Sequence, residues 1–150
     1  MSNLKRKPMA LPLRYCSYGL FVALWLTGCT WLVLQFLFRP ETEFGVVAHP
    51  LQSPLLLAHG VLAIPALYLF GWISPGHALE RWCNRQRRAS GGTLWLMLAA
   101  LTLTGFALFF LAVDSVHEYS TLVHESLGVA AGAAALVHWI RHRGTRGGNP

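Results

Sequence analysis

Four long apolar stretches constrain this chain more than any other feature of its sequence. They cover residues 15–38, 53–73 (with an inner end that could extend to 79), 93–113 and 122–140. Each has close to the ~20 residues that an α-helix needs to cross a ~30 Å hydrocarbon layer. Because only short connections separate them, with outer loops expected at 39–52 and 114–121, successive helices are expected to pack as antiparallel neighbours. The sequence therefore predicts an all-α integral membrane protein, an up-down-up-down four-helix bundle.

The composition argues against an ordinary cytoplasmic enzyme. Only 12% of the 150 residues are charged, whereas a soluble domain carries about a quarter. The four spans leave no room for a second folded domain. We expect a basic cytoplasmic segment at 1–14, one transmembrane domain at 15–140 and a basic cytoplasmic tail at 141–150.

The basic residues predict the orientation of the bundle. Eleven of the twelve Lys and Arg residues lie on the side that holds both termini, and Arg39 is the exception. The positive-inside rule makes that side cytoplasmic, so both termini are expected on the cytoplasmic side of the membrane. Topology and anionic membrane lipid explain the net charge of +6, and a nucleic-acid partner is unsupported.

A candidate processing signal overlaps the first span. Residues 26–29 have the shape of a lipoprotein cleavage site, but the apolar run continues to residue 38, far beyond a signal-peptide core. An uncleaved span is favoured. The three cysteines, Cys16, Cys29 and Cys83, predict no structural disulfide. No Cys-x-x-Cys-His motif occurs, so covalent attachment of a c-type haem is excluded.

Histidines inside the spans are the candidate functional residues. Ionisable side chains in a membrane are costly and are usually functional. His59 lies near the outer end of the second span and His124 near the outer start of the fourth. Both spans run inwards, so the two imidazoles are expected at similar depth on different helices. This arrangement suits one haem iron held between two helices.

A second pair is expected near the inner surface. His77 follows His59 by eighteen residues, five turns and about 27 Å, and His138 follows His124 by fourteen residues, about 21 Å. The two rises differ by about 6 Å, which prolines of the second span could reduce by kinking it. His142, eighteen residues after His124, is the alternative partner.

Bis-histidine ligation of haem fits these residues because iron takes axial ligands from both sides of the macrocycle and neutral imidazole tolerates burial. Gly60 adjoins His59 and Gly128 follows His124 by four residues, so each ligand has flat space nearby. The small residues of 128–135 would admit either another helix or a flat ligand. Four arginines could pair with propionates of an inner haem, although topology alone also explains them: Arg81, Arg85, Arg88 and Arg141.

Residues 58–139 resemble the small bacterial membrane cytochromes b related to cytochrome b561 and to formate dehydrogenase gamma-type subunits, especially a four-helix group known as a domain of unknown function. The resemblance rests on the order and spacing of Ala58-His59-Gly60, Gly76-His77, Trp82 with Arg85 and Arg88, Ser90-Gly91, Leu103-Thr104-Gly105-Phe106, His124-Glu125 with Gly128, and His138-Trp139. It implies that His59, His77, His124 and His138 are haem ligands and that the function is electron transfer. The Cys83-Asn84 stretch and the wide spacing from His59 to His77 depart from the pattern.

The expected function is that of a cytochrome b with two haems, or one, acting as an electron-transfer subunit rather than a complete enzyme. Its partners would be other redox subunits or quinone, with candidate quinone contacts at His49, Gln52, Ser53 and Glu125. The alternatives are a membrane anchor or assembly subunit without haem, and a membrane protein that binds a metal through its histidines. The spans lack the mid-membrane acids typical of a transporter.

Overall fold

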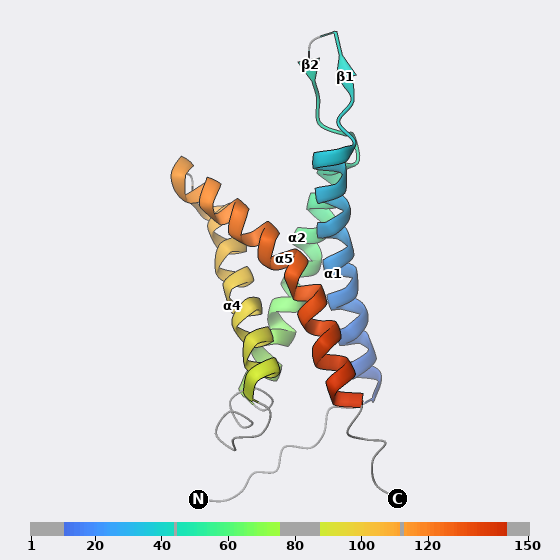
Figure 1. The fold of residues 1–150 in the computed structure, drawn as a ribbon, viewed down its shortest axis with the longest axis vertical. Coiled ribbons are helices and arrows are strands. Elements are labelled where there is room, and N and C mark those ends of the chain that lie inside the picture. The colour runs from blue at the N-terminus through green and yellow to red at the C-terminus, as the bar shows by residue number, and fades with distance from the viewer. Residues whose placement is uncertain (1–10, 44, 76–87, 112, 144–150) are drawn as a thin grey trace, which may run out of the picture.

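Four long helices make up most of the computed structural model, which describes residues 11–43, 45–75, 88–111 and 113–143 (Figure 1). They are α1 (Leu11–Leu37), α2 (Gln52–Ile73), α4 (Arg88–Phe110) and α5 (Asp114–Arg143). A small antiparallel hairpin of β1 (Glu41–Thr42) and β2 (Gly45–Val46) joins α1 to α2. Gly45 has a φ of +104°, a conformation that glycine adopts without strain. We call the end of the molecule that carries β1 and β2 the hairpin end.

The prediction of four helices that are long and apolar enough to span a membrane is confirmed. Within the described residues, four segments are long and apolar enough to cross a membrane: Leu11–Leu37, Gln52–Ile73, Gly91–Phe110 and Asp114–Ile140. The large apolar side chains face outwards, as with Leu103 and Phe109, which are 71% and 74% exposed. Ala66 and Ala131 are the small apolar residues buried between helices. Outward apolar faces and small residues at helix contacts are typical of membrane bundles.

The prediction of a second outer loop at 114–121 is wrong. Those residues form the first two turns of α5, which begins at Asp114 and has 30 residues. A helix of that length is about 45 Å long, well over the thickness of the hydrocarbon layer. The polar residues therefore extend the helix beyond its apolar part, and the carboxylate of Asp114 lies at the N-terminus, where the helix dipole favours negative charge.

The helices pack as two pairs that cross. α1 lies along α2, α4 lies along α5, and α1 also contacts α5. α5 runs obliquely from the side of α4 at the hairpin end to the side of α1 at the other end (Figure 1). Two tryptophans link the pairs: Trp25 Nε1 donates to Gly128 O at 3.0 Å, and Trp95 Nε1 donates to Ser74 Oγ at 2.9 Å.

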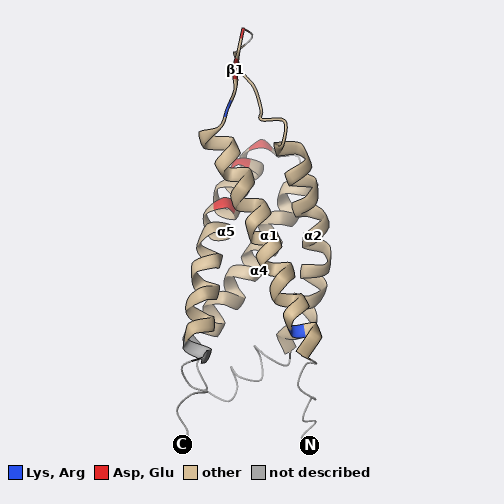
Figure 2. Cartoon of the chain, turned by 90° about the vertical axis from the view of Figure 1, so that its right-hand side faces the viewer, with Lys and Arg blue, Asp and Glu red and all other residues tan. Residues whose placement is uncertain are grey.

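Acidic residues gather towards the hairpin end of the described part of the chain (Figure 2). Glu41 and Glu43 lie on and beside β1, and Asp114, Glu118 and Glu125 lie in the first half of α5. Arg14 lies in the first turns of α1, at the opposite end. The acidic residues of the described part of the chain are therefore concentrated at the hairpin end, where Arg39 also lies, between α1 and β1.

Candidate functional site

His59 of α2 and His124 of α5 face each other between the two helix pairs. Their ring centroids are 6.3 Å apart and their planes cross at 84°. The sequence predicts these two histidines at similar depth, and the fold brings them together. Because α2 belongs to one helix pair and α5 to the other, the paired imidazoles lie where the pairs meet.

The His59 ring is seated on α1. Its Nδ1 lies 3.0 Å from Leu24 O and 3.1 Å from Thr27 Oγ1. A Cβ on Gly28 would lie 3.0 Å from His59 Cε1, so the ring packs against bare backbone at that position. Thr27 Oγ1 in turn donates to Leu24 O at 2.9 Å. One turn of α1 therefore supplies a carbonyl, a hydroxyl and a glycine to this imidazole.

The His124 ring is seated on α4 in the same way. Its Nδ1 lies 2.9 Å from Thr104 Oγ1, and it also has a backbone hydrogen bond at Leu101. A Cβ on Gly105 would lie 3.3 Å from His124 Cε1. Thr104 Oγ1 donates to Ala100 O at 2.9 Å and to Leu101 O at 3.2 Å. The contacts of His124 thus repeat those of His59 on the other helix pair.

These hydrogen bonds determine which ring nitrogen carries the proton. A hydroxyl has one hydrogen, and each threonine gives it to a carbonyl of its own helix. Each hydroxyl oxygen can therefore only accept from the neighbouring Nδ1, and a carbonyl can only accept as well. All of these contacts are satisfied together when Nδ1 carries the proton in both rings, and each neutral imidazole then presents Nε2 as a lone-pair donor. Hydrogen bonding of the second ring nitrogen is how proteins orient histidine ligands.

The helix turns that hold the rings are not among the site residues predicted from the sequence. α1 carries Leu24, Thr27 and Gly28, and α4 carries Leu101, Thr104 and Gly105, in the same Leu-x-x-Thr-Gly spacing. In the sequence, residues 26–29 stand out only as a possible cleavage signal, and Thr104-Gly105 only as part of the pattern that carries the family resemblance, with no role assigned. The repeated spacing in residues 24–28 and 101–105 is the signal that could have identified both turns.

His138 is also seated against a glycine of α4. A Cβ on Gly91 would lie 3.6 Å from His138 Cε1. His138 follows His124 by fourteen residues and Gly91 precedes Gly105 by fourteen, so one pair of helices repeats the contact four turns further along. His77, Arg81 and Arg85 lie outside the described residues, as do the side chains of Arg88, Arg141 and His142.

The two glycines expected beside the outer haem lie against other side chains. A Cβ on Gly60 would lie 3.5 Å from Phe109 Cζ, and one on Gly128 would lie 4.0 Å from Leu101 Cδ2. The small-residue face of α5 receives the indole of Trp25, since a Cβ on Gly132 would lie 2.5 Å from Trp25 Cε2. Part of the 128–135 stretch therefore serves a contact between helices.

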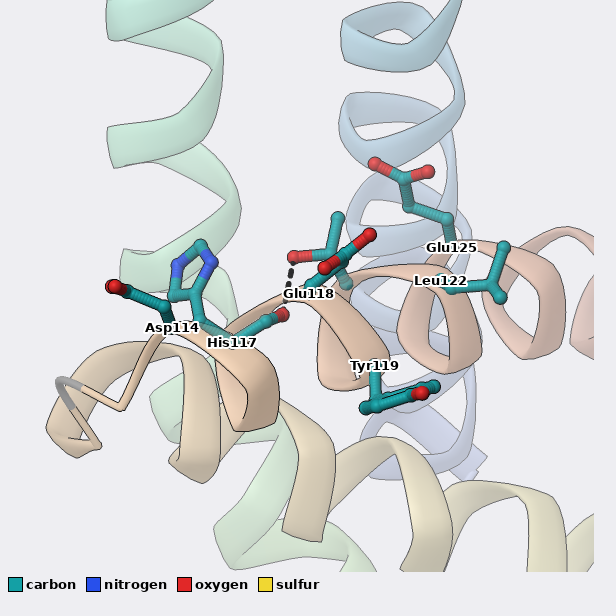
Figure 3. A pocket seen from close by; sticks show the side chains of 7 residues that line it. Asp114, His117, Glu118, Tyr119, Leu122 and Glu125 are labelled. Atoms are coloured by element: carbon teal, nitrogen blue, oxygen red, sulfur yellow. Dashed lines mark hydrogen bonds between the residues drawn. The ribbon is translucent and has the colours of Figure 1, made fainter.

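The residues expected to contact quinone have separate roles in the structure. Gln52 is buried, and its Nε2 donates to Gln35 Oε1 at 3.0 Å. His49 Nδ1 accepts from the backbone N–H of Leu51 at 3.2 Å, at the start of α2. Ser53 is exposed. Glu125 lines a shallow pocket on α5, together with Asp114, His117, Glu118, Tyr119, Thr121 and Leu122 (Figure 3).

The chain matches no protein-family model, no curated protein and no solved structure. Among the described residues, no cluster of three or more His, Cys, Asp or Glu side chains is arranged to hold a metal ion. The paired imidazoles of His59 and His124 are therefore a donor set of two.

Proposed function

We propose that the chain is a b-type membrane cytochrome that relays electrons through a bacterial inner membrane as a subunit of a larger redox system. The observation that carries the proposal is the pair of imidazoles formed by His59 and His124, with centroids 6.3 Å apart. We further propose that the bundle is up-down-up-down with both termini in the cytoplasm. The acidic hairpin end and the distribution of basic residues support this orientation.

The spacing of the rings suits two ligands on one metal. A five-membered ring with bonds of about 1.33 Å has a radius of about 1.1 Å, and histidine nitrogen binds first-row metals at about 2.0–2.1 Å. Two imidazoles that bind one ion from opposite sides therefore have centroids about 6.3 Å apart. His59 and His124 have this separation.

The donor set favours haem over a bare ion. A porphyrin supplies four nitrogens to iron and leaves two axial positions, which bis-histidine proteins fill with imidazole. The chain offers two imidazoles, both with Nε2 available because Nδ1 is hydrogen-bonded beside a threonine hydroxyl. Gly28 and Gly105 keep the ring edges clear of side chains. Haem held by His59 and His124 would supply one-electron chemistry, and the two imidazoles would occupy the positions at which a substrate could otherwise bind the iron.

A second haem is proposed nearer the cytoplasmic surface. Its ligands would be His77 and His138, with His142 as the alternative to His138. The contact of His138 with Gly91 supports this site, because it repeats the contact of His124 with Gly105. The rise of about 21 Å between His124 and His138 would stack the two haems across the membrane. Flanking residues of the two sites would be Gly60, Gly128, Arg81, Arg85, Arg88 and Arg141.

The electron donor and acceptor would be other redox subunits or quinone. The candidate quinone contacts at the hairpin end are His49, Gln52, Ser53 and Glu125. Of these, Glu125 lines a pocket that opens at the surface of α5. A carboxylate at that position could take up or release the proton that accompanies quinone chemistry.

Optical spectroscopy of His59→Ala and His124→Ala tests the proposal. The purified wild-type protein is expected to show a b-type reduced-minus-oxidised spectrum and about two haems per chain in a pyridine haemochrome assay. Each variant should lose the haem bound between the helix pairs, while His117→Ala, a histidine in the exposed first turns of α5, should keep it. Wild-type protein without haem under haem-sufficient expression, or full haem content in both variants, would contradict the proposal.

A further inference from the structure

The angle between the planes of the two imidazoles is fixed by the fold, and it would determine the electron paramagnetic resonance signal of a haem bound between them. The planes of His59 and His124 cross at 84°. The significance of this angle rests on the proposed haem between these residues. Binding to iron through Nε2 would fix one axis of each ring. Rotation about that axis would then be restricted by the Cβ–Cγ bond to the histidine's own helix and by a hydrogen bond from Nδ1, which lies off the axis.

Each ring takes its rotation from a different helix pair. His59 Nδ1 is held by Leu24 O and Thr27 Oγ1 on α1, and His124 Nδ1 is held by Thr104 Oγ1 on α4. α1 and α4 belong to different pairs, so the two acceptors point from different directions. The crossed planes are therefore a consequence of how the two helix pairs meet.

The threonine hydroxyls suit this role because their own hydrogens are already used. Thr27 Oγ1 donates to Leu24 O and Thr104 Oγ1 donates to Ala100 O, which fixes the direction of each oxygen. The β-branched side chain also has a restricted χ1 in a helix. Valine has the same shape without the oxygen, so replacing threonine by valine removes the hydroxyl acceptor and leaves the packing and the backbone hydrogen bonds at Leu24 and Leu101.

We propose that Thr27 and Thr104 are positioning residues that hold the two axial imidazoles perpendicular and thereby give the haem between them a highly anisotropic low-spin ferric state. Each imidazole donates π-electron density to the iron d orbital that is perpendicular to its plane. Parallel rings raise one of two such orbitals and split the pair. Perpendicular rings raise both equally, and the nearly degenerate pair gives large g-anisotropy.

Low-temperature electron paramagnetic resonance of the oxidised protein tests this inference. The wild type is expected to give a highly anisotropic low-spin signal, with one dominant low-field feature, in place of the three-line rhombic signal of near-parallel rings. Spectra are also recorded in a His138→Ala background, which removes the signal of the proposed second haem. A rhombic signal from the haem of His59 and His124 would overturn the inference and leave the cytochrome proposal intact.

Variants of the two threonines test the assignment to these residues. Thr27→Val and Thr104→Val should each convert part of the anisotropic signal to a rhombic one, and the double variant should convert more. Thr27→Ser and Thr104→Ser should keep the wild-type signal because serine retains the acceptor. Thr102→Val is the matched control, since Thr102 Oγ1 donates to Leu98 O on its own helix.

The outcomes separate the two proposals. An anisotropic signal that is unchanged in the valine variants would overturn the positioning role. A second outcome would support the positioning role. In it, the valine variants lose haem, the serine variants and Thr102→Val keep it, and the helical circular dichroism is unchanged. The hydroxyl would then be needed for the imidazole to bind the iron. A wild type with no Soret band would refute the cytochrome proposal itself.

Discussion

The contact of Trp25 with Gly132 gives a quantitative test of how the two helix pairs meet. A Cβ on Gly132 would lie 2.5, 2.6 and 2.8 Å from Cε2, Nε1 and Cζ2 of the indole, whereas unstrained heavy-atom contacts lie at about 3.5–4.0 Å. In Gly132→Ala the indole must therefore retreat by about 1 Å. That retreat also breaks the 3.0 Å hydrogen bond from Trp25 Nε1 to Gly128 O.

The expected net cost of Gly132→Ala is about 1–2 kcal/mol. Overpacking costs about 1–3 kcal/mol, a hydrogen bond in a membrane bundle contributes about 0.6 kcal/mol, and the better helix propensity of alanine offsets about 0.8–1 kcal/mol. A loss of this size lowers the folding equilibrium constant by roughly 5- to 30-fold. The measurement is reversible unfolding in detergent micelles by SDS titration, followed by circular dichroism at equal haem content.

Two comparisons isolate the contact. Gly19→Ala on α1 meets nothing within 4 Å and should be neutral or stabilising by up to about 1 kcal/mol. In a Trp25→Ala background the penalty of Gly132→Ala should disappear, because the indole that it strikes is gone. Gly132→Ala that unfolds like Gly19→Ala, or a penalty that persists without the indole, would refute this packing of α1 against α5.

Two further predictions concern the polar contacts at either end of the bundle. Gln52→Ala leaves Gln35 Oε1 without the 3.0 Å hydrogen bond that it accepts. This variant should lower the free energy of unfolding by about 1–2 kcal/mol in the same titration. Ser53→Ala, at an exposed position, should lower it by less than about 0.5 kcal/mol. Trp95→Phe removes the hydrogen-bond donor to Ser74 Oγ and should lower the free energy of unfolding by about 0.6 kcal/mol. A variant as stable as the wild type would show that this hydrogen bond does not stabilise the packing of α4 against the end of α2.

The positions of the helices could be predicted from the sequence, but the end of one could not. Apolar runs identify the part of a helix that lies in lipid, and all four were found in this way. The start of α5 at Asp114 was missed because its first two turns are polar. A helix continues as long as its backbone hydrogen bonds are made, and hydropathy does not report those bonds.

The sequence by itself determined four spans and placed His59 and His124 at matching depth on the second and fourth. Span length and helical periodicity are local properties, so they can be read along one chain. Only the tertiary structure decided that Thr27 and Thr104 hold these rings, that the ring planes cross at 84°, and that Trp25 fills the small-residue face of α5. Which helix covers which face depends on the packing of side chains from distant segments, and periodicity within one helix contains no information about its neighbour.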